Sequence, residues 1–160
     1  RRPGVTAVFR LRLDAFSTEG FRRLAAEIVR NGCPRVQLDA DIPERRLAEY
    51  VSENTEPDAV FATATNHNNA IAMLTGRSIV CGAGTFLYYH GLDYQPREAA
   101  LKLVYEQPAE WLDFYAQEYG IDYLLVSSHE RGSWAVDEEY FAAELDCVYS
   151  DGDLALYSLK

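Results

Sequence analysis

The sequence carries a run of polar side chains whose types suit ligand binding. Residues 65–69 read Thr-Asn-His-Asn-Asn and follow an apolar stretch, 59–63, that is typical of a buried strand. In open α/β sheets, ligands bind beyond the carboxyl ends of the strands. Amides, a hydroxyl and an imidazole at the start of a helix favour an anion or a polar ligand, whereas simple helix capping needs only one such residue. The candidate binding residues here are Asn66, His67, Asn68 and Asn69.

A second candidate segment follows the apolar run 78–81. Glycines at 82 and 84 allow a tight turn or a close approach of backbone to a ligand. The spacing resembles the beginning of a dinucleotide-binding fingerprint, but Leu87 occupies the place of the third glycine, so we interpret the pair as a structural turn. After this turn come polar and aromatic residues of types that can bind a sugar or a phosphate. The alternative is that the tyrosines bury their rings at a helix end and the arginines pair with local carboxylates. The candidates of this segment and its flanks are Arg77, Gly82, Gly84, Tyr88, His90, Asp93 and Arg97.

Patterns for metal binding and catalysis are sparse. Asp39 and Asp41 form an Asp-x-Asp pair of the kind that holds a divalent metal in some transferases, but two carboxylates are too few ligands for a site, and Asp41 can instead cap a helix that begins near Pro43. No Gly-x-Ser-x-Gly elbow is present, and the run Ser-Ser-His at 127–129 lacks a matching carboxylate context. The sequence therefore predicts no catalytic residue, no metal site and no cofactor. Cys33, Cys81 and Cys147 are expected to be small buried hydrophobic residues.

Composition limits the classes of protein. The chain has 160 residues, 48% of them apolar, which fits a single soluble domain over residues 1–160. No apolar run approaches the roughly 18 residues of a membrane span. Residues 51–160 carry five basic and eighteen acidic side chains, which argues against nucleic acid as a partner. Because Met73 is the only methionine, we expect the domain to be a piece of a larger protein.

The elements that position these residues follow from apolar periodicity. Strands that alternate with helices indicate a three-layer, mostly parallel, Rossmann-like α/β sheet with helices on both faces. Asp151 and Gly152 lie between two alternating runs and predict a C-terminal antiparallel hairpin. If the strands at 59–63 and 78–81 are parallel neighbours, both candidate loops emerge at one sheet edge. The predicted strands are 5–13, 35–38, 59–63, 78–81, 123–126, 145–149 and 154–157, and helices are expected to begin near residues 17, 43, 71, 96, 108 and 137.

The order of several short motifs resembles a known family. The motifs are Glu-Asn-Thr-Glu-Pro-Asp-Ala-Val-Phe at 53–61, Asn-His-Asn-Asn at 66–69, Gly-Arg at 76–77, Gly-Ala-Gly at 82–84, His-Gly-Leu-Asp-Tyr at 90–94 with Arg97, and Tyr-Gly-Ile-Asp-Tyr-Leu-Leu-Val at 119–126. In this order they resemble the C-terminal soluble domain of bacterial multi-pass membrane glycosyltransferases of the GT-C type. The resemblance covers about residues 43–160. It departs from the family at Ala70, where a proline is expected, and at Phe86 or Leu87, near which a tryptophan is expected.

The resemblance implies a role beside a membrane. Enzymes of this family move a sugar from a polyprenyl-phosphate carrier to an acceptor outside the cytoplasm, and their catalytic acid lies between the first membrane helices. The domain is then an accessory on the extracytoplasmic side of a membrane-anchored parent, without activity alone. Its expected partners are the transmembrane portion of its own chain and a sugar or polyprenyl-phosphate-linked substrate. The alternatives are a free-standing nucleotide-sugar-binding or metal-dependent transferase that uses Asp39, Asp41 and the loop from Gly82 to Gly84, and a ligand-free interaction domain.

Overall fold

The computed structural model of the chain describes residues 42–159. The strand predicted at 5–13, the helix near residue 17, the strand at 35–38, the Asp39–Asp41 pair and Cys33 lie outside the described residues. Within these residues there are seven helices: α2 (Pro43–Asn54), the π-helical η2 (Ile71–Thr75), α3 (Gly84–Tyr89), α4 (Gln95–Glu106), α5 (Pro108–Tyr119), α6 (Ser128–Ser133) and α7 (Glu138–Glu144). Five strands of the described part are β1 (Val60–Ala62), β2 (Ser78–Ile79), β3 (Tyr123–Val126), β4 (Asp146–Asp151) and β5 (Leu154–Ser158).

The five strands form one sheet in the order β2-β1-β3-β5-β4. β1 pairs in parallel with β2 and with β3, while β5 runs antiparallel to both β3 and β4. The hairpin predicted around Gly152 joins β4 to β5, with this glycine at φ 62°. The predicted parallel core with an antiparallel C-terminal edge is therefore confirmed, and β1 and β2 are indeed parallel neighbours.

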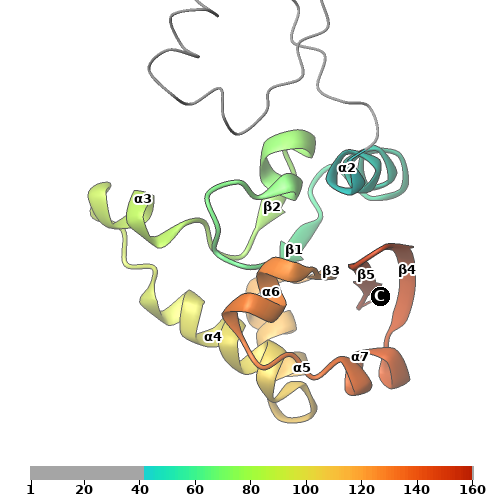
Figure 1. Cartoon of the computed structure of the whole chain (residues 1–160). Helices are drawn as coiled ribbons and strands as arrows, with labels where there is room; N and C mark the ends of the chain where they lie inside the picture. The colour runs from blue at the N-terminus through green and yellow to red at the C-terminus, as the bar shows by residue number, and fades with distance from the viewer. Residues whose placement is uncertain (1–41, 160) are drawn as a thin grey trace, which may run out of the picture. The chain divides into compact units, whose positions relative to one another are not determined.

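Helices cover both faces of the sheet, as the sequence predicts. Side chains of a strand alternate between the two faces, and in β3 Leu124 joins one apolar cluster while Leu125 joins the other. The first cluster takes Leu101 and Val104 from α4, and the second takes Leu47 from α2. Figure 1 shows α2 on one side of the strands and α4 and α5 on the other. The result is a three-layer α/β domain.

Helix ends follow the predicted stop signals. Gly76 ends η2 and Gly120 ends α5, both in the left-handed conformation with φ 69° and 64°. Pro108 opens α5 at a position where its missing N–H has no intrahelical partner. These signals are local, which explains why the sequence predicts them well.

Several details differ from the sequence predictions. β2 has two residues rather than the four of the predicted run 78–81. Met73 is 66% exposed although it shares a short helix with the buried Ile71. Cys147 is exposed on β4, so its predicted burial is wrong; β4 is an edge strand with partners on one side only. The apolar pattern of the sequence does not predict helix α6.

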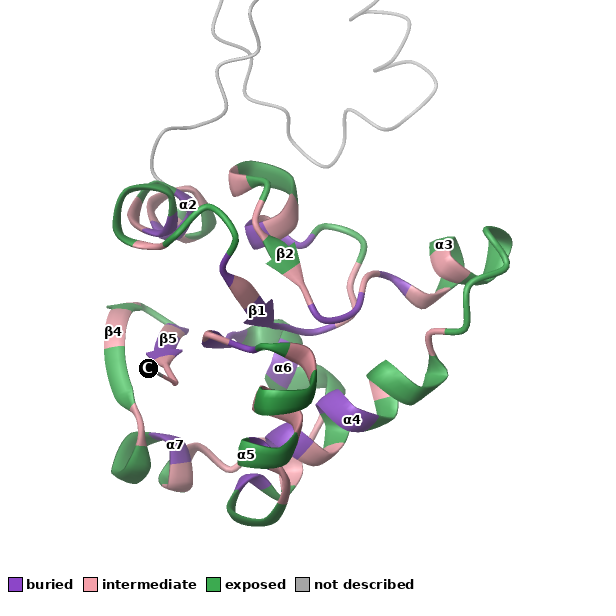
Figure 2. Ribbon diagram, turned by 180° about the vertical axis from the view of Figure 1, so that it is seen from behind, coloured by how far each residue is buried: buried purple, intermediate pink, exposed green. Residues whose placement is uncertain are grey.

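Figure 2 shows where burial is concentrated: the central strands are buried, whereas α3 carries no buried residue. Within residues 42–159, no helix combines the length and the apolar character that a membrane crossing requires.

Candidate functional site

The loop after β1 is held in place by polar contacts with a distant helix. The backbone N–H of Ala64 donates to Oε1 of Glu130 at 2.6 Å, and the Ser127 hydroxyl donates to the other oxygen of the same carboxylate. Glu130 is only 1% exposed. A buried carboxylate must be hydrogen-bonded to be tolerated, so this side chain joins the exits of β1 and β3.

Asn69 fixes the same loop from within. Its side-chain amide donates to Oγ1 of Thr63 at 2.7 Å and to the Ala64 carbonyl at 3.3 Å, while its Oδ1 accepts from the N–H of Ala72 at 3.2 Å. All the polar atoms of this amide are therefore used inside the protein. Asn69, a predicted ligand-binding residue, serves the loop and the start of η2, which matches the capping alternative.

Asn66 and Asn68 lie at the crevice between the carboxyl ends of β1 and β3. The chain leaves β1 toward η2, which packs with α2, and leaves β3 through α6 toward α7, whose Phe141 belongs to the cluster on the opposite face. Such a switch in direction is where open α/β sheets bind ligands. The crevice has a volume of about 30 Å³, which holds little more than water. It is lined by polar residues of both exits together with neighbouring apolar ones: Glu44, Leu47, Asn66, Asn68, Asn69, Ala70, Leu125, Ser127, Ser128, His129, Glu130 and Leu154.

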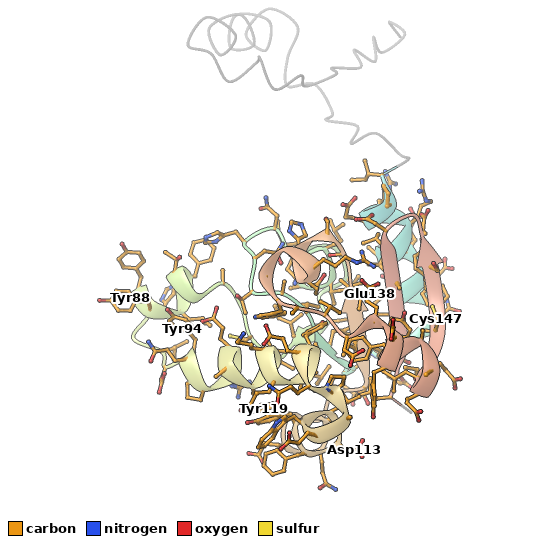
Figure 3. The ribbon with its side chains drawn as sticks, turned by 60° about the horizontal axis from the view of Figure 1, so that its bottom comes forward. Tyr88, Tyr94, Asp113, Tyr119, Glu138 and Cys147 are labelled. Carbon is orange, nitrogen blue, oxygen red and sulfur yellow. The ribbon has the colours of Figure 1, made fainter. Side chains whose placement is uncertain are left out.

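The two candidate loops meet at one contact. The ring of His67 lies edge-on to that of Phe86 in α3, with centroids 4.5 Å apart. Beyond this contact α3 extends away from the sheet, and Tyr88 lies at the margin of the domain (Figure 3). Phe86, Tyr88 and Tyr89 are 59%, 70% and 79% exposed. His67 and Tyr88 therefore belong to one edge, as predicted, but neither lines the crevice.

Gly84 lies against an aromatic ring. A Cβ built on this residue would stand 2.5 Å from Cε2 of Tyr94, whereas one on Gly82 would meet nothing within 4 Å. Because Gly84 has no side chain, the ring of Tyr94 can pack on the turn. This agrees with the interpretation of the glycine pair as a structural turn. Asp93 accepts the backbone N–H of Gln95 through Oδ1 at 3.3 Å, at the start of α4.

Both candidate arginines contact the protein itself. Arg77 donates to the carbonyl of Thr55 at 2.9 Å and to that of Ser52 at 3.4 Å, at the C-terminal end of α2. Arg97 donates to the carbonyl of Val80 at 2.9 Å, and its guanidinium lies 5.2 Å from the ring centroid of Tyr119. A helix C-terminus and an aromatic face are favourable places for a cation. These contacts stabilise the fold, and a ligand role for either arginine stays a prediction.

Two groups near the edge have raised pKa values. Burial raises the pKa of the Cys81 thiol, Glu98 raises it further and Arg97 partly opposes the rise. Burial, with Glu130 as a smaller cause, raises the pKa of Tyr105 well above its ordinary value. Cys81 is thus the small, unreactive hydrophobic residue that the sequence predicts.

A second hollow, which shares no lining residue with the crevice, was missed by sequence reasoning. It is an open groove of about 500 Å³ beside Thr65, lined from the loop after β1, from α4 and from the end of α6. The seven lining residues are Thr65, Gln95, Glu98, Ala99, Lys102, Ser133 and Trp134. In the part of the chain that the structure describes, no three His, Cys, Asp or Glu side chains gather as metal ligands would.

One missed contact did have a signal in the sequence. Ser127 and Glu130 form the Ser-x-x-Glu pattern of a capping box, and Ser127 does accept the N–H of His129 at the start of α6. The carboxylate of Glu130 then turns to Ala64, 66 residues earlier in the chain. No local pattern predicts that partner. The groove likewise brings together segments that are far apart in the chain, so spacing could not reveal it.

Comparison with solved structures identifies a similar fold. The chain is similar to the crystal structure of the C-terminal globular domain of an oligosaccharyltransferase from Archaeoglobus fulgidus, with a TM-score of 0.52 and 10% sequence identity. The similarity covers 75% of this chain and 99% of that chain. At this identity the likeness concerns the fold alone. No protein-family model matches the chain, and no curated protein matches it.

Proposed function

We propose that the chain is an accessory extracytoplasmic domain of a multi-pass membrane glycosyltransferase of the GT-C type. The observation that carries the proposal is the fold, which is similar to nearly the whole of a C-terminal globular domain of an oligosaccharyltransferase. The family resemblance of the sequence motifs supports the same assignment independently. The catalytic acid and the polyprenyl-phosphate-sugar site belong to the membrane portion of the parent, and the domain transfers no sugar by itself.

The carboxyl edge of the parallel strands is the part of the domain that faces sugar or acceptor. Three motifs of the family resemblance, at 66–69, 82–84 and 90–94, lie in the segments that follow the neighbouring strands β1 and β2. Glu130 and Asn69 hold the first loop rigidly, which lowers the entropy cost of binding. His67 is exposed on this edge and offers imidazole nitrogens to hydroxyl or phosphate groups.

Helix α3 provides the contact with the transmembrane portion of the parent. Residues 82–92 contain no Asp, Glu, Lys or Arg, in a chain of which these types make up 25%. Phe86, Tyr88, Tyr89 and Leu92 are all more than half exposed. Tyrosine and phenylalanine are enriched at protein interfaces and at membrane boundaries, where apolar rings are covered and hydroxyls stay wet. This surface is also the observation that favours the second candidate, an interaction domain without a ligand.

The experiment that separates the two candidates uses the full-length parent. The coding sequence upstream should encode several apolar segments of membrane length, and His67→Ala should lower sugar transfer from a lipid-linked donor by about tenfold, the loss of one good polar contact. Gln117→Ala, at an exposed position near the end of α5, is the control for removing a polar side chain away from this edge. If upstream membrane segments are absent, the glycosyltransferase assignment fails. If these segments are present but the rate of sugar transfer is unchanged in His67→Ala, the domain is an interaction module.

A further inference from the structure

The groove beside Thr65 is open to solvent, large enough for a small ligand and lined mainly by polar residues. Its volume of about 500 Å³ lies within the range of small-molecule pockets, about 300–1,000 Å³. Five of its seven lining residues are polar, so an apolar ligand would leave their donors and acceptors unpaired. The groove adjoins the Asn-His-Asn-Asn loop, because Thr65 directly precedes Asn66.

Trp134 gives this groove a rigid aromatic wall. Its indole stacks on the ring of the buried Tyr105, with centroids 4.9 Å apart and an angle of 20° between the planes. Its backbone N–H donates to the carbonyl of Glu130 at 2.9 Å. The next residue, Ala135, donates to Oε1 of Glu106 at 3.3 Å, which ties the segment to α4. Stacking covers one face of this half-buried indole, and Trp134 also lines the groove.

The charged groups of the groove select against an anion. Its one cation, Lys102, is paired with both oxygens of Glu106 at 2.7 Å. Oε1 of Glu98 accepts a hydrogen bond from the Thr65 hydroxyl at 3.1 Å, and its second carboxylate oxygen is a further acceptor. Gln95 is exposed and adds an amide that both donates and accepts. A phosphate would meet a carboxylate without an unpaired cation to offset it, whereas sugar hydroxyls match all of these groups.

We propose that the groove between α4 and the end of α6 binds a neutral saccharide unit, with Trp134 stacking on the sugar ring and Gln95, Glu98 and Thr65 contacting its hydroxyl groups. The proposal rests on the proposed function for its setting, because an accessory domain of a sugar-transferring enzyme meets saccharides. It adds a site on a different set of side chains from the crevice and from α3.

The chain has two tryptophans, which permits a sharp test. In Trp111→Phe, Trp134 is the only remaining indole; in Trp134→Phe, Trp111 on α5 is the only one, and a phenyl ring still stacks on Tyr105. Each 160-residue variant is titrated with glucose, mannose, galactose, arabinose, N-acetylglucosamine and maltose up to about 100 mM, well above a millimolar dissociation constant. We expect saturable emission changes from Trp134 with at least one sugar and none from Trp111.

A second pair of variants identifies the polar contacts. Gln95→Ala, at an exposed position of α4, and Glu98→Gln, at a half-buried one, are made in the Trp111→Phe background and should each weaken binding at least fivefold. Glu110→Gln, exposed on α5, should leave it unchanged. The proposal is overturned if Trp134 responds to no sugar, or if the affinity is insensitive to both α4 variants. Neither result affects the outcome of the His67→Ala experiment. Failure of the saccharide-site proposal can therefore be distinguished from failure of the proposed function.

Discussion

At the scale of single residues, Glu130 decides the geometry of the carboxyl edge. Its carboxylate accepts from Ala64 in one strand exit and from Ser127 in the other, and it is buried with both partners. Removing such a group leaves buried donors without acceptors, which costs more than the hydrogen bonds themselves contribute. The edge that we propose to face the sugar thus depends on a residue that contacts no ligand.

Glu130→Ala should lower the free energy of unfolding by about 3 kcal/mol, because two buried donors lose their acceptor. Glu130→Gln retains an acceptor oxygen and should lose about half as much. The measurement is urea unfolding followed by circular dichroism, with the exposed Glu139→Ala as the control expected to stay within about 0.5 kcal/mol of the wild type. A Glu130→Ala variant as stable as that control would show that the two loops hold their positions without the carboxylate.

The raised pKa of Tyr105 should make the domain less stable at alkaline pH. The phenol contacts the carbonyls of Ala62 and Leu125 at 2.9 and 2.6 Å, and burial raises its pKa well above the ordinary value. The folded protein therefore holds this proton more tightly than the unfolded chain. Its contribution is fully present below the unfolded pKa of about 10 and is lost as pH rises above it.

Tyr105→Phe should cost about 1 kcal/mol near neutrality, since the hydroxyl bonds are lost, and should flatten the alkaline decline. Unfolding free energies measured from about pH 8 to about pH 11 should then converge for variant and wild type. Tyr89→Phe, at an exposed position, should follow the wild-type curve throughout. Parallel curves for Tyr105→Phe and wild type would contradict the assignment of the pH dependence to this phenol.

At the scale of elements, helix α3 differs from the rest because it is attached by few contacts. It has no buried residue; Gly84 packs on the Tyr94 ring, and Phe86 meets His67. An element held in this way can adjust to a partner at little cost in packing. This behaviour fits the proposed role of α3 as a contact surface for a membrane portion of the parent.

Gly84→Ala tests how α3 is anchored. A Cβ at this position would press on Tyr94, so the variant should lose about 1 kcal/mol even though alanine favours helix. In a Tyr94→Ala background the same change should be neutral or stabilising, while Gly82→Ala, with open space around its Cβ, should not depend on Tyr94. Equal effects of Gly84→Ala in both backgrounds, measured by thermal unfolding, would rule out the contact as an anchor.

Elements were predicted far better than contacts. Periodicity and stop signals are local, and they identified the strands around Phe61 and Leu124, the glycine stops at Gly76 and Gly120, and the hairpin at Gly152. Polar candidates were harder, because a side chain gives no local sign of its partner. The side chain of Asn69 donates to Thr63 inside the protein, and those of Arg77 and Arg97 donate to backbone carbonyls. Trp134 was overlooked because its neighbours in the groove come from other segments.

At the scale of the whole molecule, charge is the dominant feature beyond the fold. The chain carries a formal net charge of −10, and residues 51–160 alone carry −13. Such an excess of one sign repels itself and opposes the compact state. An acidic body is also repelled by anionic lipid, so the uncharged α3 surface is the part that fits the proposed contact with a membrane portion of the parent.

Ionic strength should therefore stabilise the domain, whereas divalent metals should have no specific effect. Raising NaCl from about 10 mM to about 200 mM shortens the screening length from about 30 Å to less than 10 Å, so the melting temperature should rise by a few degrees. Mg²⁺, Mn²⁺ or Ca²⁺ at matched ionic strength should give the same rise, because no carboxylate cluster in residues 42–159 offers the six or so oxygen ligands that such ions need. A chelator should leave the melting temperature unchanged. A stabilisation by one divalent ion that exceeds the matched NaCl value and disappears in Asp39→Ala would contradict this prediction. It would also support the Asp39–Asp41 pair as a metal site, and with it the alternative that the chain is a free-standing transferase.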